Sequence, residues 1–187
     1  GAVSGDTVNL SLGSATFANK NVGTAKAVTA SGTSVTGADA ANYSITDPTS
    51  LSADITARAL SVSASGINRI YDGSTVATVN LGDDRVSGDT LSLSNSAATF
   101  ANKTVGTGKT VSVSGINVSG ADATNYTFNT TASTTATITQ KALTLTGVSA
   151  SNKVYDGLTS ASISGGTLGG AVSGDTVNLS LGSATFA

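Results

Sequence analysis

An internal repeat of about 85 residues constrains this chain more than any other feature. Residues 16–20 (TFANK) return unchanged as residues 99–103, and residues 37–43 (GADAANY) return with one substitution as 120–126. Tyr71-Asp72-Gly73 recurs one repeat later as Tyr155-Asp156-Gly157. Any fold proposed for one copy of the repeat must therefore hold for the next, and it must allow neighbouring copies to follow one another closely.

The register of the repeat divides the chain into three segments. Residues 57–139 form one complete repeat, residues 1–56 form the C-terminal part of the preceding one, and residues 140–187 form the N-terminal part of the next. Residues 170–187 are identical to residues 1–18, so this identity spans two repeat lengths. It predicts a parent array that alternates two repeat types. We call the three parts the N-terminal, central and C-terminal segments.

Apolar and polar residues alternate over short stretches, which predicts strands with one face on a core and the other in water. Glycine-containing pairs such as Ser-Gly and Asp-Gly separate these stretches and indicate turns. We expect an all-β fold of small antiparallel sandwich-like repeats, either Ig-like or β-grasp-like, with about seven short strands each, stacked into an extended rod. Single helical turns are possible at residues 38–41 and 121–124. The alternating stretches are residues 8–12, 60–63, 91–93, 111–113 and 143–146.

The composition opposes disorder and enzymatic activity. Hydrophobic residues make up 39% of the chain, net charge is −2 and there is one proline, whereas disordered chains usually combine low hydrophobicity with high charge. The chain lacks His, Cys and Glu, so the usual nucleophile–base pairs and thiol or zinc chemistry are missing. We predict no catalytic residue, no bound cofactor and no enzyme.

Charge and hydropathy also limit the classes of partner that the chain could bind. A pI near 4.7 without a basic cluster argues against nucleic acid, and no apolar run approaches the roughly 20 residues of a membrane span. Residues 105–110 (VGTGKT) resemble the end of a phosphate-binding loop, but Lys103 stands where the first glycine is needed. We expect neighbouring repeats to be the main partners, with no membrane insertion in this segment.

The most distinctive local motif is the Tyr-Asp-Gly triplet, Tyr71, Asp72 and Gly73 with its copy Tyr155, Asp156 and Gly157. An aspartate beside an aromatic ring could make weak contacts with a sugar or an ion. Alternatively, Asp-Gly forms a turn in which glycine takes a positive φ while tyrosine anchors the turn to the core. The structural interpretation is favoured. Exposed tyrosine rings would favour binding, and buried rings a structural role.

Two other site hypotheses remain open. The recurring aspartates could bind calcium at repeat junctions, although calcium needs several converging carboxylates and these are separated. An autocatalytic isopeptide bond needs lysine, asparagine and a carboxylic acid in an apolar pocket. The sets that offer those ingredients are Lys20, Asp39 and Asn42, and Lys103, Asp122 and Asn125. Surface lysine and turn-forming asparagine are the simpler account.

The whole chain resembles the YDG-type and MBG-type tandem repeats of large bacterial surface adhesins of the filamentous-haemagglutinin-like kind. The resemblance is carried, in order, by residues 101–109 (ANKTVGTGK), 118–122 (VSGAD), 125–126 (NY), 135–139 (TATIT), 153–157 (KVYDG) and 172–176 (VSGDT). It implies a secreted protein of the bacterial outer cell surface, and it offers no catalytic residues. The function it implies is a structural stalk that extends a distal binding region of an adhesin or biofilm filament away from the cell.

Two alternatives to the stalk remain. The repeats could bind extracellular polysaccharide or matrix in a multivalent way, or the chain could self-assemble into an extracellular fibre through its partial repeats.

Overall fold

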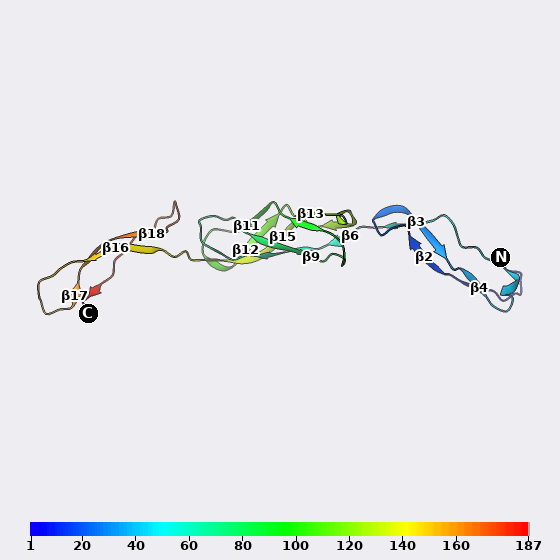
Figure 1. Cartoon of the computed structure of the whole chain (residues 1–187), viewed down its shortest axis with the longest axis horizontal. Helices are drawn as coiled ribbons and strands as arrows, with labels where there is room; N and C mark the ends of the chain where they lie inside the picture. The colour runs from blue at the N-terminus through cyan, green and yellow to red at the C-terminus, as the bar shows by residue number, and fades with distance from the viewer. Residues whose placement is uncertain (187) are drawn as a thin grey trace. The chain divides into compact units, whose positions relative to one another are not determined.

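The computed structural model describes residues 1–186 and is all-β, as expected (Figure 1). Ala187, the last residue of the C-terminal segment, lies outside the described residues. Two single 3₁₀ turns, η1 (Ala40–Asn42) and η2 (Ala123–Asn125), overlap the two places where helical turns were expected. Among residues 1–186 no helix is both long and apolar enough to cross a membrane. The strands of the N-terminal segment are β1 (Asn9–Ser11), β2 (Ser14–Phe17), β3 (Gly23–Ser31), β4 (Ser34–Thr36) and β5 (Leu51–Ile55).

The central segment contains ten strands, and the C-terminal segment four within its described residues. Those of the central segment are β6 (Arg58–Leu60), β7 (Val62–Gly66), β8 (Arg69–Ile70), β9 (Val79–Asp83), β10 (Ser92–Ser94), β11 (Ala97–Phe100), β12 (Gly106–Ser114), β13 (Asn117–Ser119), β14 (Tyr126–Phe128) and β15 (Thr131–Thr139). Those of the C-terminal segment are β16 (Thr144–Ala150), β17 (Ser160–Ala161), β18 (Ile163–Gly169) and β19 (Ala184–Thr185). Seven strands per repeat was therefore an underestimate, because single residues such as Ser61 interrupt runs that alternate continuously in sequence.

The chain divides into two compact units, each built from several segments. The first contains residues 1–61, 84–92 and 118–129, and the second contains residues 62–83, 93–117 and 130–186. A unit therefore takes strands from distant parts of the sequence, and each unit includes residues from two of the three repeat segments.

The second unit has the best-developed core. Its four-stranded sheet has the order β11-β12-β15-β8, and β11, β12 and β15 lie side by side in Figure 1. Val111 and Val113 of β12 are 0% and 2% exposed, while Ser112 between them faces solvent. Phe100 pairs with Val111 and is 3% exposed. The alternation predicted for residues 111–113 is confirmed, because one face of β12 packs against the core.

The loop-like sequence at residues 105–110 takes part in this sheet. Gly106 and Lys109 both pair with β15, with a register shift between them that marks a bulge. Gly108 lies in this bulge with a φ of +58°, a conformation that glycine adopts without strain. The glycines that resemble a phosphate loop therefore serve strand geometry.

The first unit is thinner. It contains the sheet β2-β3-β5, the pair β1–β4 and the pair β6–β14. Its buried apolar side chains are Leu60, Leu91, Val118 and Tyr126. All four belong to the central segment, so the N-terminal segment adds strands to this unit and no fully buried side chain.

Antiparallel pairing dominates but is not complete. β14 runs parallel to β6, and β15 runs parallel to β8. Turn residues fix only hairpin neighbours, whereas these pairs join strands from the two ends of the central segment, at Tyr126↔Arg58 and Ile138↔Arg69. The purely antiparallel expectation was wrong at these two places for that reason.

Candidate functional site

The first Tyr-Asp-Gly triplet forms a tight turn. The Oδ1 of Asp72 accepts a hydrogen bond from the backbone N–H of Ser74 at 2.8 Å, and its Oδ2 forms an ion pair with Arg69 at 2.7 Å. Gly73 has a φ of +81°, a conformation that side chains disfavour. Hydrogen bonds from Ser74, backbone first, and the nearby Arg69 charge hold the pKa of Asp72 below its usual value.

The second triplet repeats this turn. Asp156 accepts from Lys153 at 2.7 Å and from the backbone N–H of Leu158 at 3.0 Å, and Gly157 has a φ of +76°. The bond from Lys153, then the one from Leu158, lowers the pKa of Asp156. The Asp-Gly turn predicted from sequence is thus present in both copies, and both carboxylates already bind groups of their own turn.

A cation beside each turn also lies over an aromatic ring. The guanidinium carbon of Arg69 lies 5.1 Å from the ring centre of Phe100, and the Lys153 ammonium lies 5.9 Å from that of Phe186. Distances below about 6 Å permit a cation–π interaction. The first turn is thereby joined to the last residue of β11, and the second to the residue that follows β19.

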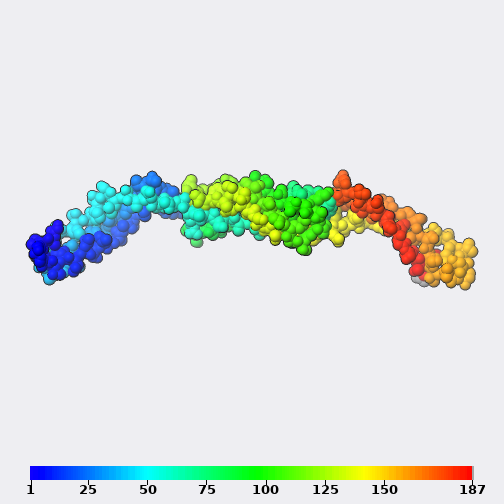
Figure 2. Space-filling model, turned by 180° about the vertical axis from the view of Figure 1, so that it is seen from behind, coloured from blue at the N-terminus to red at the C-terminus, as the bar shows by residue number. Residues whose placement is uncertain are grey.

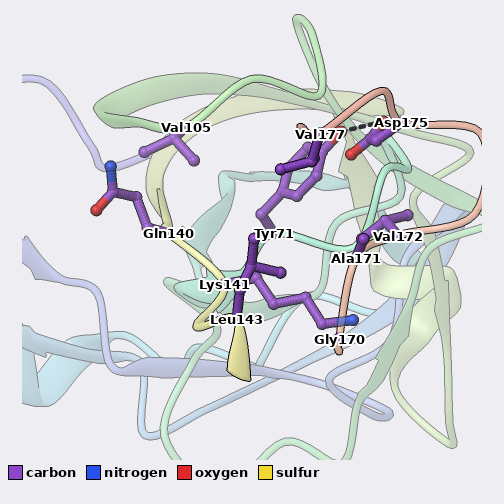
Figure 3. Close-up of a pocket in the computed structure, with 10 residues that line it drawn as sticks. All are labelled: Tyr71, Val105, Gln140, Lys141, Leu143, Gly170, Ala171, Val172, Asp175 and Val177. Atoms are coloured by element: carbon purple, nitrogen blue, oxygen red, sulfur yellow. Dashed lines mark hydrogen bonds between the residues drawn. The ribbon is translucent and has the colours of Figure 1, made fainter. Parts of the chain in front are cut away.

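The two tyrosines of the triplets differ in their surroundings. The Tyr71 hydroxyl donates a hydrogen bond to Asp175 at 3.1 Å, drawn as a dashed line in Figure 3, whereas Tyr155 is 93% exposed. The bond to Asp175, aided by partial burial, raises the pKa of Tyr71. Tyr71 is half-buried and lies outside the core, so it contacts the C-terminal segment and not the core, to which it was expected to anchor the turn.

Tyr71 lines a cleft of about 230 Å³ that we call the second junction. It combines residues of the central segment with residues that begin at position 140, and Lys103 lies 3.6 Å from Asp175 at its edge. The lining residues, labelled in Figure 3, are Tyr71, Val105, Gln140, Lys141, Leu143, Gly170, Ala171, Val172, Asp175 and Val177.

An equivalent cleft, which we call the first junction, lies where the N-terminal segment meets the central one. It also measures about 230 Å³. Lys20 lies 2.6 Å from Asp89 and 2.9 Å from Asp122. The carboxylate side chains are only 11% and 15% exposed, while that of Lys20 is 65% exposed. The lining residues are Lys20, Val22, Ile55, Thr56, Arg58, Val86, Asp89, Asn125 and Tyr126.

Charge pairing sets the ionisation states of Lys20, Asp89 and Asp122, which we call the first-junction cluster. The bonds to Asp89 and then Asp122 raise the pKa of Lys20 well above its usual range. The pKa of Asp89 is lowered by Lys20 and then by Tyr126, and that of Asp122 by the backbone N–H of Thr90 and then by Lys20. At neutral pH the cluster therefore holds one ammonium group and two carboxylates.

Polar contacts of the central segment complete the first junction. The Tyr126 hydroxyl donates to Asp89 at 2.6 Å and accepts from the backbone N–H of Val86 at 3.0 Å. The Oδ1 of Asn125 accepts from the backbone N–H of Val22 at 2.9 Å. The Asn125–Val22 bond and the two Lys20 ion pairs therefore bridge the N-terminal and central segments, and the two Tyr126 bonds hold Asp89 in place within the central segment.

The sequence singled out Lys20, Asp122 and Asn125 only in two separate isopeptide sets, and it did not predict that Lys20 pairs with Asp89 and Asp122. The Lys20–Asp89 pair recurs as Lys103–Asp175, in each case between the TFANK stretch of one segment and the SGDT stretch of the next. Both the TFANK and the SGDT stretches recur in the sequence, and this recurrence is the signal that could have pointed to the pair. Recurrence alone, however, does not show that a lysine and an aspartate so far apart in sequence meet.

The structure does not assemble the proposed isopeptide or calcium sites. Asp39 accepts from the backbone N–H of Thr7 at 2.8 Å, while Lys20 pairs with Asp89 and Asp122. Lys103 of the second set lies 3.6 Å from Asp175 of the C-terminal segment. Within residues 1–186 no three metal-binding side chains of the His, Cys, Asp or Glu type converge. Asp89 and Asp122 both form an ion pair with the Lys20 ammonium group, which occupies the position between them that a metal ion would need.

A comparison with known protein families finds a match over most of the chain. The YDG domain matches the chain over residues 1–50, 56–136 and 139–187. No curated protein and no solved structure gives a significant match. With nearly the whole length covered by these three matches, the chain belongs to the YDG domain family.

Proposed function

We propose that these residues are part of the structural stalk of an extracellular bacterial adhesin or biofilm filament. In this proposal successive repeats act as spacers that hold a distal binding region away from the cell. The observation that carries the proposal is the recurring lysine–aspartate pair, Lys20–Asp89 and Lys103–Asp175, which joins the back part of one repeat to the front part of the next.

The physical support lies in how each junction is held. A spacer works only if neighbouring repeats resist bending, and a single covalent linker does little against bending. At the first junction Asp89 receives hydrogen bonds from Lys20 and Tyr126, which come from different repeats. Asn125 adds a contact to the backbone of Val22. Several contacts at separate points restrain rotation more strongly than one exposed ion pair does.

Solution scattering on polypeptides of two and four repeats tests the proposal. The repeating unit is the pair of repeats that separates residue 1 from its duplicate, residue 170, so one and two such pairs serve as the two samples. For a stalk, the maximum dimension grows in proportion to the number of repeats. Compact particles of similar maximum dimension would contradict the proposal.

A matched variant links this measurement to the junction. Replacing every junction lysine by methionine, as Lys20→Met and Lys103→Met, removes the charge and keeps most of the side-chain volume. We expect a shorter mean dimension and a broader distance distribution. Lys26→Met is the control, because Lys26 bonds to Asn19 of its own repeat.

A second candidate, multivalent binding of extracellular polysaccharide, is favoured by one observation. The Tyr155 ring is 93% exposed beside the Asp156 turn, and exposed aromatic rings can stack on sugars. Glycan-array binding of the whole chain tests this candidate. Retention that Tyr155→Ala abolishes and Tyr71→Ala preserves would support it, whereas a lack of retention on any glycan would exclude it.

A further inference from the structure

The two parallel strand pairs of the central segment join its beginning to its end. β6 lies parallel to β14, with Arg58 opposite Tyr126, and β8 lies parallel to β15, with Arg69 opposite Ile138. Each pair lies within one compact unit. Figure 2 shows cyan and yellow-green residues, from the two ends of this segment, in contact on the visible face. The first strands of the segment are therefore held directly by its last strands.

The direction of these strands decides how they respond to tension along the chain. Tension enters the central segment at residue 57, just before β6, and leaves it at residue 139, the last residue of β15. Hence β6 and β8 are pulled by their N-terminal ends, whereas β15, and β14 just before it, are pulled by their C-terminal ends. Parallel strands pulled at these opposite ends slide along each other, so the evenly spaced hydrogen bonds between them share the load.

The two pairs carry this load in succession. β6 comes first along the chain, and tension reaches β8 only after β6 has been displaced from β14. While β8 remains paired with β15, tension passes from one strand directly to the other. Residues 72–130, which connect these two strands along the chain, therefore carry no tension until both parallel pairs have separated.

Contacts beyond the ladder reinforce the pairing of β8 with β15. The backbone N–H of Tyr71 donates to the carbonyl oxygen of Thr139 at 2.9 Å, and the backbone N–H of Thr137 donates to the Oδ1 of Asn68 at 2.7 Å. The Oγ1 of Thr139 also donates to the carbonyl oxygen of Arg69 at 3.3 Å. These bonds extend the parallel contact on both sides of the two paired positions.

The same pair is closely packed. Ile138 of β15 is 0% exposed, and a Cβ added to Gly66 would lie 2.6 Å from the carbonyl oxygen of Thr135. The guanidinium group of Arg69, in β8, lies over the ring of the buried Phe100. Sliding of β8 along β15 therefore breaks backbone hydrogen bonds and disturbs buried side chains in the same step.

An antiparallel pair in the same sheet would respond differently. Gly106 of β12 lies opposite Ile138 of β15, so the N-terminal end of β12 lies beside the C-terminal end of β15. Tension between these adjacent ends opens the hydrogen bonds one after another, because each bond in turn bears the whole load. The strand order of the central segment therefore keeps this weaker arrangement out of the path of tension.

We propose that the central segment bears tension, and that its two parallel pairs, β6–β14 and β8–β15, act as a force clamp. This function goes beyond the proposed stalk. A spacer sets length and stiffness, whereas a force clamp sets the rate at which a repeat unfolds under load. A chain could form a spacer without a force clamp, so the two proposals stand or fall separately.

Single-molecule force spectroscopy of the full chain tests the force clamp by changing only the direction of pulling. The sequence contains no cysteine, so two introduced cysteines define the points of attachment. Ala57→Cys with Gln140→Cys loads the force clamp in shear, and Val105→Cys with Gln140→Cys opens β12 from β15; all of these positions are exposed. We expect the shear direction to require several times the force of the opening direction. Equal forces in the two directions would overturn the inference.

A matched pair of substitutions tests the bonds of the force clamp in the shear direction. Asn68→Ala removes the acceptor of the Thr137 N–H, so unfolding at constant force should become about three- to tenfold faster, the effect of one hydrogen bond. Asn80→Ala makes the same change in β9, which carries no tension while β8 and β15 remain paired, and it should leave the rate unchanged. Equal effects of the two substitutions would contradict the force clamp.

A third variant separates resistance to force from stability at rest. Ile116 is 3% exposed and lies outside both parallel pairs. Ile116→Ala should lower the urea midpoint and leave the unfolding rate in shear unchanged, because its contacts stay intact while the force clamp breaks. A shear rate that simply follows the urea midpoint across the three variants would overturn the inference. Solution scattering, which measures length alone, decides the stalk proposal independently.

Discussion

The ammonium group of Lys20 lies 2.6 Å from the carboxylate of Asp89, although the two residues are far apart along the chain. Lys20 ends one recurring stretch and Asp89 lies in another, and both stretches return in the next repeat as Lys103 and Asp175. A pair that recurs between successive repeats belongs to the way the repeats are joined, and it is the feature on which our proposed stalk function depends.

Lys20→Met should raise the pKa of Asp89 and Asp122 toward the usual aspartate value of about 3.9. The reason is that Lys20 is the first cause of the lowered pKa of Asp89 and a leading cause for Asp122. Carboxyl-carbon NMR during an acid titration measures both values. Lys26→Met should leave both unchanged, and a rise of the same size in that variant would show that the effect is general.

The first junction should weaken in acid. Because the pKa of Asp89 and of Asp122 is lower in the folded chain, their contribution to stability is complete above the unfolded value of about 3.9. It is lost as the pH falls through the folded values. Hydrogen exchange at Thr90 and Val22 between neutral and strongly acidic pH should show protection that declines only below about pH 4. Protection that already declines near pH 6.5, well above the pKa of an aspartate, would contradict the assignment of this effect to Asp89 and Asp122.

The same junction should also weaken in strong base. The raised pKa of Lys20 and of Tyr126 means that both groups stabilise the fold fully below their unfolded values of about 10. Their contribution is lost as the pH rises further. Ultraviolet titration of tyrosine should show late-ionising phenols, and Tyr126→Phe or Tyr71→Phe should each remove one of them. An unchanged late phase in both variants would contradict the hydrogen bonds to Asp89 and Asp175.

Phe100→Ala should destabilise the second unit by about 3–5 kcal/mol, the usual cost of removing a buried phenylalanine. Phe100 is 3% exposed, and Arg69 lies over its ring. Phe17→Ala is the matched control, because Phe17 is 42% exposed and should cost about 1 kcal/mol or less. Hydrogen exchange of β12 and β3 amides reports the two units separately. Equal costs at both positions would show that exposure does not govern the difference.

Gly73→Ala should destabilise the chain more than Gly157→Ala. Both glycines have a positive φ, so alanine costs about 1–2 kcal/mol at either position. At Gly73 the added Cβ would also lie 2.8 Å from a methyl group of Val172, whereas nothing lies within 4 Å at Gly157. Urea unfolding measures both costs, and adding Val172→Ala should recover part of the loss at Gly73. An equal cost for both glycines would contradict the close approach of Val172 to Gly73.

Several features of the fold could be predicted because they depend on residues close together in sequence. The alternation at Val111 and Val113 places both side chains on one face of a strand whatever that strand pairs with. The Asp72-Gly73 turn follows from a side chain that bonds two residues ahead and from a residue that tolerates positive φ. The recurrence of both patterns in each repeat follows from the sequence in the same direct way.

The candidate site could not be predicted to the same extent. The Tyr-Asp-Gly triplets are the most distinctive local motifs and were therefore the candidate site. In the structure, however, Asp72 and Asp156 bind partners within their own turns. Tyr71 was singled out as part of a triplet, but its partner Asp175 belongs to the following segment. Nothing in the local sequence of either residue specifies the other.

The sequence by itself determined the all-β class, the register of the repeats and the geometry of the Asp-Gly turns, because each depends on periodicity or on contacts between near neighbours. Only the tertiary structure decided the parallel pairs of β6 with β14 and of β8 with β15. It also decided the meeting of Lys20 with Asp89 and of Tyr71 with Asp175. These contacts close very long loops, and such closure depends on the burial of whole faces rather than on the preference of any short segment.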